Sequence, residues 1–380
     1  MSEKNKIAIL TLYHNNYNYG GLLQSFALWK VLEGQGYDAR QVSYVLDSGY
    51  PGYSTNFIQP VKDFAKSVLY GSYYTGVKKR RKAMNIFEAE IPHTDEVTAQ
   101  NIQKLNGSFD TFVCGSDQIW NPIGWQNTLF LSFVDPGKRK IAYAASMARE
   151  SLTREEATYA YKMTRDFYAI SLREEKSLAA MQQYYPDFRA DIMPDPTLLL
   201  EQDEWKALAA LGETGDKGDY IFAYFLGTDN YNREMAIQYA RERHQKIYFI
   251  NYMDVANRQW EKSHKNVMCP KGIVEVPDFL ALIKNASLVI TDSFHGAVFS
   301  SIFHTPYVAM NRFKNSDKNS MNSRIDTLMA TLNINRKIES LNATHDYSLT
   351  DEETRNIDTA LRIQRKKGID FLNRAITGDL

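Results

Sequence analysis

The chain has 380 residues, of which 44% are hydrophobic and 24% charged, a size and composition that suit about two globular domains. Lys and Arg balance Asp and Glu at 45 each, which excludes the strongly basic character of nucleic-acid-binding proteins. The two cysteines, Cys114 and Cys269, match no zinc or redox spacing and fit a reducing compartment, so we expect a cytoplasmic protein without a bound metal.

The first residues, MSEKNKIAILTLY, hold one short apolar run that ends in polar residues, as a first β-strand would. They lack the apolar segment and the small-residue cleavage site of a signal peptide. No stretch approaches ~18 consecutive apolar residues, so the sequence predicts no membrane span.

Short apolar runs then alternate with longer amphipathic stretches along the chain. The predicted strands are Ile7–Leu12, Ala39–Val45, Thr111–Cys114, Lys140–Ala145, Ala169–Leu172, Ala190–Met193, Tyr220–Leu226, Lys246–Ile250 and Leu288–Ile290. The predicted helices are Leu22–Gln35, Arg154–Phe167, Glu174–Tyr184, Asn232–His244, Asp278–Asn285 and Gly296–Phe303. This alternation predicts an α/β fold of parallel sheets covered by helices.

A break between Leu200 and Asp219, with the polar segment GETGDKGD at Gly212–Asp219 as a linker, divides the chain. We expect a Rossmann-like domain over residues 1–205, a second over 218–340, and a helical tail over 341–380. The end of that tail, Asp351–Leu380, reads as one amphipathic helix that crosses back onto the first domain. The segment Gly49–Gln59, with Gly, Pro and aromatic residues, is predicted to be a loop.

Polar residues gather directly after the predicted strands, where ligands bind in open α/β sheets. HNNYNYGG follows the first strand and GSDQIWNP the third, Arg173 follows Ala169–Leu172, and TDSFHG follows Leu288–Ile290. The pattern predicts an interdomain cleft lined by these segments.

The glycines Gly20 and Gly21 precede a helix, whose free N–H groups would suit an anion. Taken alone, a tight strand-to-helix turn is the favoured explanation, because paired glycines are common at turns. In GSDQIWN, Asp117 and Gln118 would suit a sugar hydroxyl, and Trp120 would offer a ring face. Alternatively Asp117 caps a helix and Trp120 packs in the core.

Arg173 would grip a carboxylate or phosphate with both arms of its guanidinium, or else form a surface ion pair with Glu174 or Glu175. The basic run KKRRK at Lys78–Lys82 reads first as a solvated helix face. It would also suit anionic lipid head groups, and hence a peripheral membrane association.

TDSFHG, at Thr291–Gly296, is the strongest element. Asp292 or Ser293 would cap the helix that follows, and His295 would lie in its first turn. A Ser-His-Asp triad is rejected, because no G-x-S-x-G elbow is present and three near neighbours in one turn rarely align. At a strand end that faces a cleft, a functional histidine is favoured over a structural one.

Taken together, the motifs resemble the polysaccharide pyruvyl transferase family. The matching pieces run in order from NYGGLLQSFALWKVLEGQGYD (Asn18–Asp38) through FVCGSDQIWNP, KIAYAAS, ISLREEKS and PDPTLLL to FLALIKNASLVITDSFHGAVFSSIFHTPYV (Phe279–Val308) and SRIDTLMATLNI (Ser323–Ile334). The resemblance implies a glycosyltransferase-B-like fold of two Rossmann-like domains facing across a cleft. It also implies phosphoenolpyruvate as donor and a pair of sugar hydroxyls as acceptor, in surface polysaccharide biosynthesis.

The resemblance further implies that Arg173 and His295 engage the donor. Many members carry Arg-Leu-His where this chain has Ser293-Phe294-His295, so another arginine would have to serve the donor: Arg324 first, Arg312 second. His295 is then the expected general acid, and Asp292 or Asp117 the base. The expected substrate-binding residues are Gly20, Gly21, Gly115, Ser116, Asp117, Gln118, Trp120, Ser293, Gly296 and Arg324.

No cofactor is expected beyond the donor itself, because arginines can neutralise the phosphate. The resemblance implies a sugar or a lipid-linked oligosaccharide as the expected acceptor. Two alternatives remain open: a nucleotide-sugar-dependent glycosyltransferase on the same fold, and a non-catalytic carbohydrate-binding protein.

Overall fold

The structure, a computed structural model, describes residues 5–46, 78–213, 220–252, 257–272, 274–313 and 322–380. The loop expected over Gly49–Gln59 and most of the linker expected over Gly212–Asp219 lie outside these residues. The chain forms two compact units: residues 1–69, 85–200 and 363–380 make up unit 1, and residues 70–84 and 201–362 make up unit 2. Each unit is therefore built from more than one stretch of sequence.

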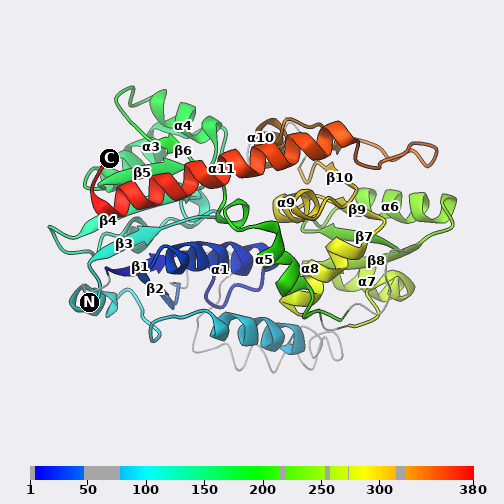
Figure 1. The fold of residues 1–380 in the computed structure, drawn as a ribbon, viewed down its shortest axis with the longest axis horizontal. Helices are drawn as coiled ribbons and strands as arrows, with labels where there is room; N and C mark the ends of the chain where they lie inside the picture. Colours follow the sequence, from blue (N-terminus) through cyan, green and yellow to red (C-terminus); the bar gives the residue numbers. More distant parts are fainter. Residues whose placement is uncertain (1–4, 47–77, 214–219, 253–256, 273, 314–321) are drawn as a thin grey trace. The chain divides into compact units, whose positions relative to one another are not determined.

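Unit 1 is built on a six-stranded sheet in the order β2-β1-β3-β4-β5-β6, in which every pairing is parallel (Figure 1). The strands are β1 (Lys6–Leu10), β2 (Asp38–Gln41), β3 (Thr111–Cys114), β4 (Arg139–Ala145), β5 (Ala169–Leu172) and β6 (Asp191–Ile192). Its longer helices are α1 (Tyr19–Gly34), α3 (Arg154–Thr164) and α4 (Glu175–Gln182). The central strands β3 and β4 are buried almost throughout, as expected for a parallel sheet covered on both faces.

Unit 2 is built on a five-stranded parallel sheet in the order β11-β10-β9-β7-β8. The strands are β7 (Tyr220–Phe225), β8 (Lys246–Asn251), β9 (Leu288–Thr291), β10 (Tyr307–Met310) and β11 (Lys337–Ile338). The helices are α5 (Gln202–Ala209), α6 (Asn230–Glu242), α7 (Arg258–Ser263), α8 (Val276–Asn285), α9 (Phe294–Phe303) and α10 (Ser323–Leu332). The two parallel sheets with their helices confirm the predicted α/β class.

The last helix, α11 (Asp351–Thr377), contributes to both units. In unit 2, Asp358 accepts a hydrogen bond from His304 at 2.8 Å. In unit 1, Arg365 donates to the carbonyls of Leu199 and Leu200 at 3.0 and 2.8 Å. The return of the C-terminal helix to the first unit was expected from its amphipathic pattern. None of the helices described here is long and apolar enough to cross a membrane.

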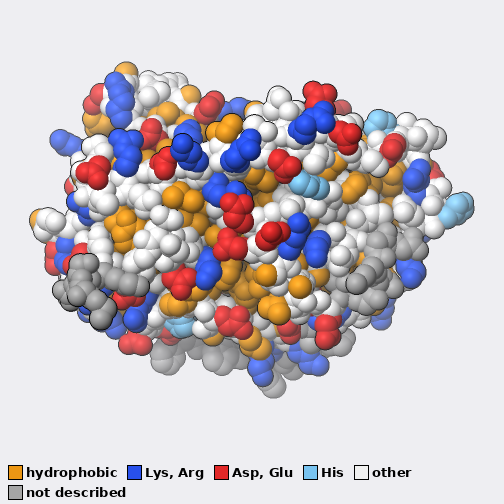
Figure 2. Space-filling model, in the orientation of Figure 1, with side chains coloured by type: hydrophobic (Ala, Val, Ile, Leu, Met, Phe, Trp, Pro, Cys, Tyr) orange, Lys and Arg blue, Asp and Glu red, His pale blue; other side chains and the backbone are white. Residues whose placement is uncertain are grey.

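Charged side chains of both signs are interspersed over the face of the molecule that Figure 2 shows. This face matches the even balance of acidic and basic residues in the composition.

Candidate functional site

The turn from β9 into α9 carries the TDSFHG motif at the carboxyl edge of the unit 2 sheet. The Ser293 hydroxyl caps α9 by accepting the Gly296 N–H at 3.3 Å. Thr291 Oγ1 accepts the Ser293 N–H at 3.0 Å and donates to the Tyr224 carbonyl at 2.6 Å, which ties the turn to β7. A Cβ at Gly296 would lie only 2.5 Å from Thr291 Oγ1, so this helix start can approach its strand only with glycine.

His295 lies in the first turn of α9, where the imidazole is 6% exposed and sits edge-on to the Phe294 ring. The surrounding helix start provides N–H groups and the positive end of a helix dipole. A histidine in this position is placed to meet a bound anion.

Asp292, expected as a catalytic base, is engaged by the backbone instead. Its Oδ1 accepts the Leu226 N–H at 2.7 Å and its Oδ2 accepts the Gly227 N–H at 2.8 Å. Because both oxygens already hold amide protons and the side chain is 2% exposed, Asp292 joins the ends of β7 and β9. These contacts give Asp292 a positioning role, and its expected role as a base stays a prediction.

Arg312 is the guanidinium found at this turn. Its Nη2 donates to the Asp292 carbonyl at 3.0 Å, and its Nε lies 3.7 Å from Asp292 Oδ1. Arg324, which the sequence ranked first as the second donor arginine, is buried at the start of α10. The contacts of Arg312 with Asp292 make it a candidate for that role beside Arg324.

A second polar cluster lies at the carboxyl edge of the unit 1 sheet, around Arg173. The guanidinium is 4% exposed and makes ion pairs with Asp195 at 2.7 Å and Glu174 at 3.0 Å, with Asp117 at 3.9 Å. Burial alone would lower the pKa of Arg173, but Glu174, Asp195 and Asp117 together raise it above its ordinary value. The surface ion pair considered from the sequence is therefore a buried network.

This network connects the segments that follow several strands. Glu174 Oε1 also accepts a hydrogen bond from Ser146 at 2.7 Å, and Asp195 caps the short turn at Thr197. One guanidinium thus faces three carboxylates, a setting that disfavours a further anion. Arg173 therefore orients Asp117 and Asp195, and its expected contact with the donor stays a prediction.

Some residues of the GSDQIWN segment lie in this cluster, and others pack in the core of unit 1. Gly115 has φ +113° and a Cβ there would lie 2.1 Å from the Tyr143 carbonyl, so only glycine fits against β4. Ser116 donates to the Ala144 carbonyl at 2.8 Å, and Gln118 accepts a hydrogen bond from Asn121 at 2.9 Å. The Trp120 ring is fully buried and stacks on Phe130 at 5.0 Å.

Trp120 is thus a core residue, and its expected role as a sugar-stacking face is corrected. The glycines Gly20 and Gly21 are buried in the first turn of α1, where Asn18 caps the helix by accepting the Gly20 N–H at 2.9 Å. A Cβ at Gly21 would lie 2.8 Å from Asn16 Nδ2, so close packing of the preceding loop accounts for this glycine.

Some members of these clusters were not among the residues chosen from the sequence. Asp195 and Glu174 complete the Arg173 network, and Gln24 accepts the Ser116 N–H at 3.2 Å. The Pro-Asp-Pro sequence after a predicted strand was the available signal for Asp195. Within the described residues, no group of three His, Cys, Asp or Glu side chains gathers as a metal-binding set.

Comparisons with solved structures identify the fold. The chain is similar to the UDP-N-acetylglucosamine 2-epimerase from Rickettsia bellii, with 10% identity, a TM-score of 0.50, and 98% of each chain covered. It is also similar to the UDP-GlcNAc 2-epimerase of Methanocaldococcus jannaschii, solved in complex with UDP-GlcNAc and UDP, with 13% identity, a TM-score of 0.50 and 99% coverage of each chain. At these identities the likeness shows a shared fold alone.

A search of curated proteins finds no match. The family model for polysaccharide pyruvyl transferase, in contrast, matches residues 18–313. This range begins at Asn18, which caps α1, and includes both polar clusters and Arg312. The chain therefore belongs to the polysaccharide pyruvyl transferase family.

Proposed function

We propose that this protein transfers a pyruvyl group from phosphoenolpyruvate to two hydroxyls of a sugar in surface polysaccharide biosynthesis, forming a cyclic ketal. The observation that carries the proposal is His295, held at the capped start of α9 in a member of this family, with the Arg312 guanidinium on the same turn. A helix start and a guanidinium together suit the carboxylate and phosphate of the donor.

In the proposed reaction, His295 gives a proton to the methylene carbon of phosphoenolpyruvate. A sugar hydroxyl loses its proton to the base, and its oxygen forms a bond to the neighbouring carbon. The bond from that carbon to the phosphate oxygen then breaks, and phosphate leaves with the electron pair. The second sugar hydroxyl attacks the same carbon and loses its proton, which closes the ring. The anionic donor would favour the charged imidazolium that the first step requires.

Arg312 and the N–H groups of α9 are proposed to stabilise the leaving phosphate as charge develops on it. Because the Asp292 oxygens are engaged by amides, Asp117 remains the proposed base for the acceptor. The acceptor is proposed to be a sugar, free or lipid-linked.

The test measures phosphate released from phosphoenolpyruvate across a panel of acceptor glycosides. His295→Ala should lower turnover by about two to four orders of magnitude, the usual contribution of a general acid, with an unchanged melting temperature. The matched control is His304→Asn, at the opposite end of α9, which should keep wild-type turnover.

Near-normal turnover in His295→Ala would remove His295 from the mechanism. Nucleotide release from a nucleotide sugar, without phosphate release from phosphoenolpyruvate, would instead favour a glycosyltransferase. Sugar binding without either reaction would favour a non-catalytic role.

A further inference from the structure

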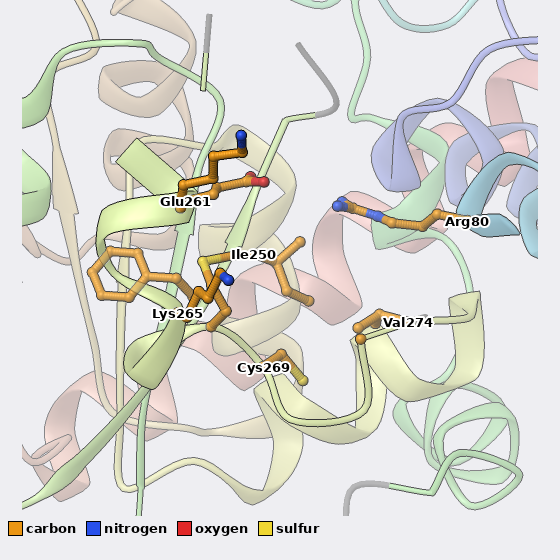
Figure 3. A pocket seen from close by; sticks show the side chains of 10 residues that line it. Arg80, Ile250, Glu261, Lys265, Cys269 and Val274 are labelled. Carbon is orange, nitrogen blue, oxygen red and sulfur yellow. The ribbon is translucent and has the colours of Figure 1, made fainter. Parts of the chain in front are cut away.

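Unit 2 contains a cavity of about 280 Å³ beside β8 and α7 (Figure 3). Its apolar lining consists of Phe249, Ile250, Met268, Cys269 and Val274. No residue proposed for the reaction lines it, so it is separate from the donor residues on α9.

The charged side chains of the lining are mostly basic. Three are cationic, Arg80, Lys262 and Lys265, and one is a carboxylate, Glu261. Arg80 and Glu261 reach toward one another from opposite sides of the cavity (Figure 3). Both are fixed by the last residue of β8, since Arg80 donates to the Asn251 carbonyl at 3.0 Å and the Asn251 amide donates to Glu261 at 3.2 Å. The sheet therefore fixes Arg80 and Glu261, and the excess of positive charge comes from Lys262 and Lys265.

The contents of such a cavity follow from its chemistry. A metal cation is disfavoured by the excess of basic side chains, and a wholly apolar ligand by the charged rim. A neutral sugar would leave the apolar floor without a matching surface. An anion that carries an apolar or aromatic group satisfies both parts of the lining.

We propose that this cavity binds an organic diphosphate, with the diphosphate against Lys262, Lys265 and Arg80 and the organic group on the apolar floor. Two ammonium groups and a guanidinium in one lining suit a group with several anionic oxygens. A nucleoside diphosphate and an isoprenoid diphosphate share this chemistry. The proposal does not depend on the pyruvyl transfer reaction.

A line of contacts joins this cavity to the β9–α9 turn. The Phe249 ring lies 5.0 Å from Trp260, and the Arg233 guanidinium lies 5.0 Å above the Trp260 ring. Arg233, 1% exposed, donates to the Gly227 carbonyl at 2.6 Å, and the Gly227 N–H is bound by Asp292. A ligand on the floor would therefore be packed against residues that support the turn.

Cys269 provides a direct measure of occupancy. It lines the cavity and is 9% exposed, whereas Cys114 is fully buried in β3 and serves as an internal reference. The rate of Cys269 alkylation by iodoacetamide is followed by mass spectrometry with uridine diphosphate, geranyl diphosphate or inorganic pyrophosphate. At ten times its Kd, a bound ligand should slow the reaction about tenfold.

We expect at least one organic diphosphate to protect Cys269 from alkylation, and pyrophosphate to protect it less. Comparison of uridine diphosphate with geranyl diphosphate then identifies which organic group the cavity prefers. Lys265→Glu should remove the protection, and Lys284→Glu, an exposed lysine on α8, should retain it. The same ligand should raise the melting temperature of the wild type but not of Lys265→Glu. This second measurement tests binding even where Cys269 reacts too slowly with iodoacetamide to be followed. Equal protection by pyrophosphate, protection that persists in Lys265→Glu, or no ligand effect in either measurement would overturn the proposal.

Discussion

At the scale of single residues, the structure separates side chains that hold the site from those free to do chemistry. Asp292 is the clearest case, because two backbone amides share its carboxylate. Asp292→Ala should leave these buried donors unsatisfied and lower the free energy of unfolding by roughly 2–5 kcal/mol.

Urea denaturation of Asp292→Ala and Asp292→Asn measures this effect, and Asn should lose less because it keeps one acceptor. A variant that unfolds like the wild type yet has no turnover would restore Asp292 as the base.

For Arg173, too, a positioning role has to be distinguished from a direct role in the reaction. Arg173→Met would leave Glu174 and Asp195 buried without their cation, and should cost about 3–5 kcal/mol of stability. Arg173→Lys should cost less but still reduce turnover, because one ammonium cannot reproduce the fork that joins the two carboxylates.

The donor KM distinguishes positioning from donor binding. We expect it to stay near the wild-type value in Arg173→Lys while turnover falls. A large rise in the KM for phosphoenolpyruvate with unchanged stability would assign Arg173 to the donor after all.

Sequence patterns located these residues better than they assigned their roles. TDSFHG and Arg173 were selected because they follow apolar strands, and both do lie at carboxyl edges of the sheets. The pattern could not show that the Leu226 and Gly227 amides point at Asp292, because that direction depends on how β7 and β9 pair. Nor could it decide between core and cleft for Trp120, since either environment accepts an aromatic ring.

At the scale of elements, local sequence predicted most strands and several boundaries. Thr111–Cys114 and Ala169–Leu172 have the predicted bounds, because each is a short apolar run closed by polar residues. The strands β10 and β11 were not predicted, and β11 has only two residues. Helix α5 lies within the predicted break and was not predicted. Its sequence is mostly polar, and its buried residues are Trp205 and Ala209.

The loop between β1 and α1 depends on an ion-paired histidine that the sequence did not single out. His14 contacts Glu88 at 2.5 Å and Glu96 at 3.0 Å, and the Asn15 side chain lies 2.9 Å from its Nε2. Burial lowers the pKa of His14, but the two glutamates outweigh it, so the pKa is raised above its ordinary value. The His14 side chain thus connects this loop to Glu88 and Glu96.

This raised pKa predicts a pH-dependent contribution to stability. The contribution should be complete below the ordinary histidine pKa of ~6.5 and should be lost as pH rises through the raised native value. The difference in urea midpoint between wild type and His14→Asn should therefore be larger at pH 5.5 than at pH 9. A difference that is constant or grows with pH would contradict an imidazolium in the native protein.

At the scale of the whole molecule, the described part of the chain passes between the two units after residues 84, 200 and 362. The last passage brings Phe371, Leu372, Ala375 and Ile376 into unit 1, where each is at most 4% exposed. The ring of Phe371 lies 6.1 Å from Tyr143 on β4, and Gly368 permits close contact with Leu199. Residues distant in sequence thereby complete the core of the first unit.

Ending the chain after residue 362 should therefore expose apolar surface of unit 1. We expect increased binding of a hydrophobic dye and faster proteolysis within residues 85–200, with residues 201–362 less affected. The matched control ends the chain after residue 377 and keeps all of α11. Equal dye binding by the two truncated chains would show that residues 363–377 are dispensable for the core.

The interleaving of the two units also sets an order of events during synthesis on the ribosome. Unit 1 is begun first, but its last segment, residues 363–380, is translated only after residues 201–362 of unit 2. At translation rates of about 5–20 residues per second, the surface around Tyr143 and Leu199 would wait roughly 10–30 s for its cover. The unit begun first is thus the last to be completed, and its nascent form is the stage at which a chaperone has the longest opportunity to bind.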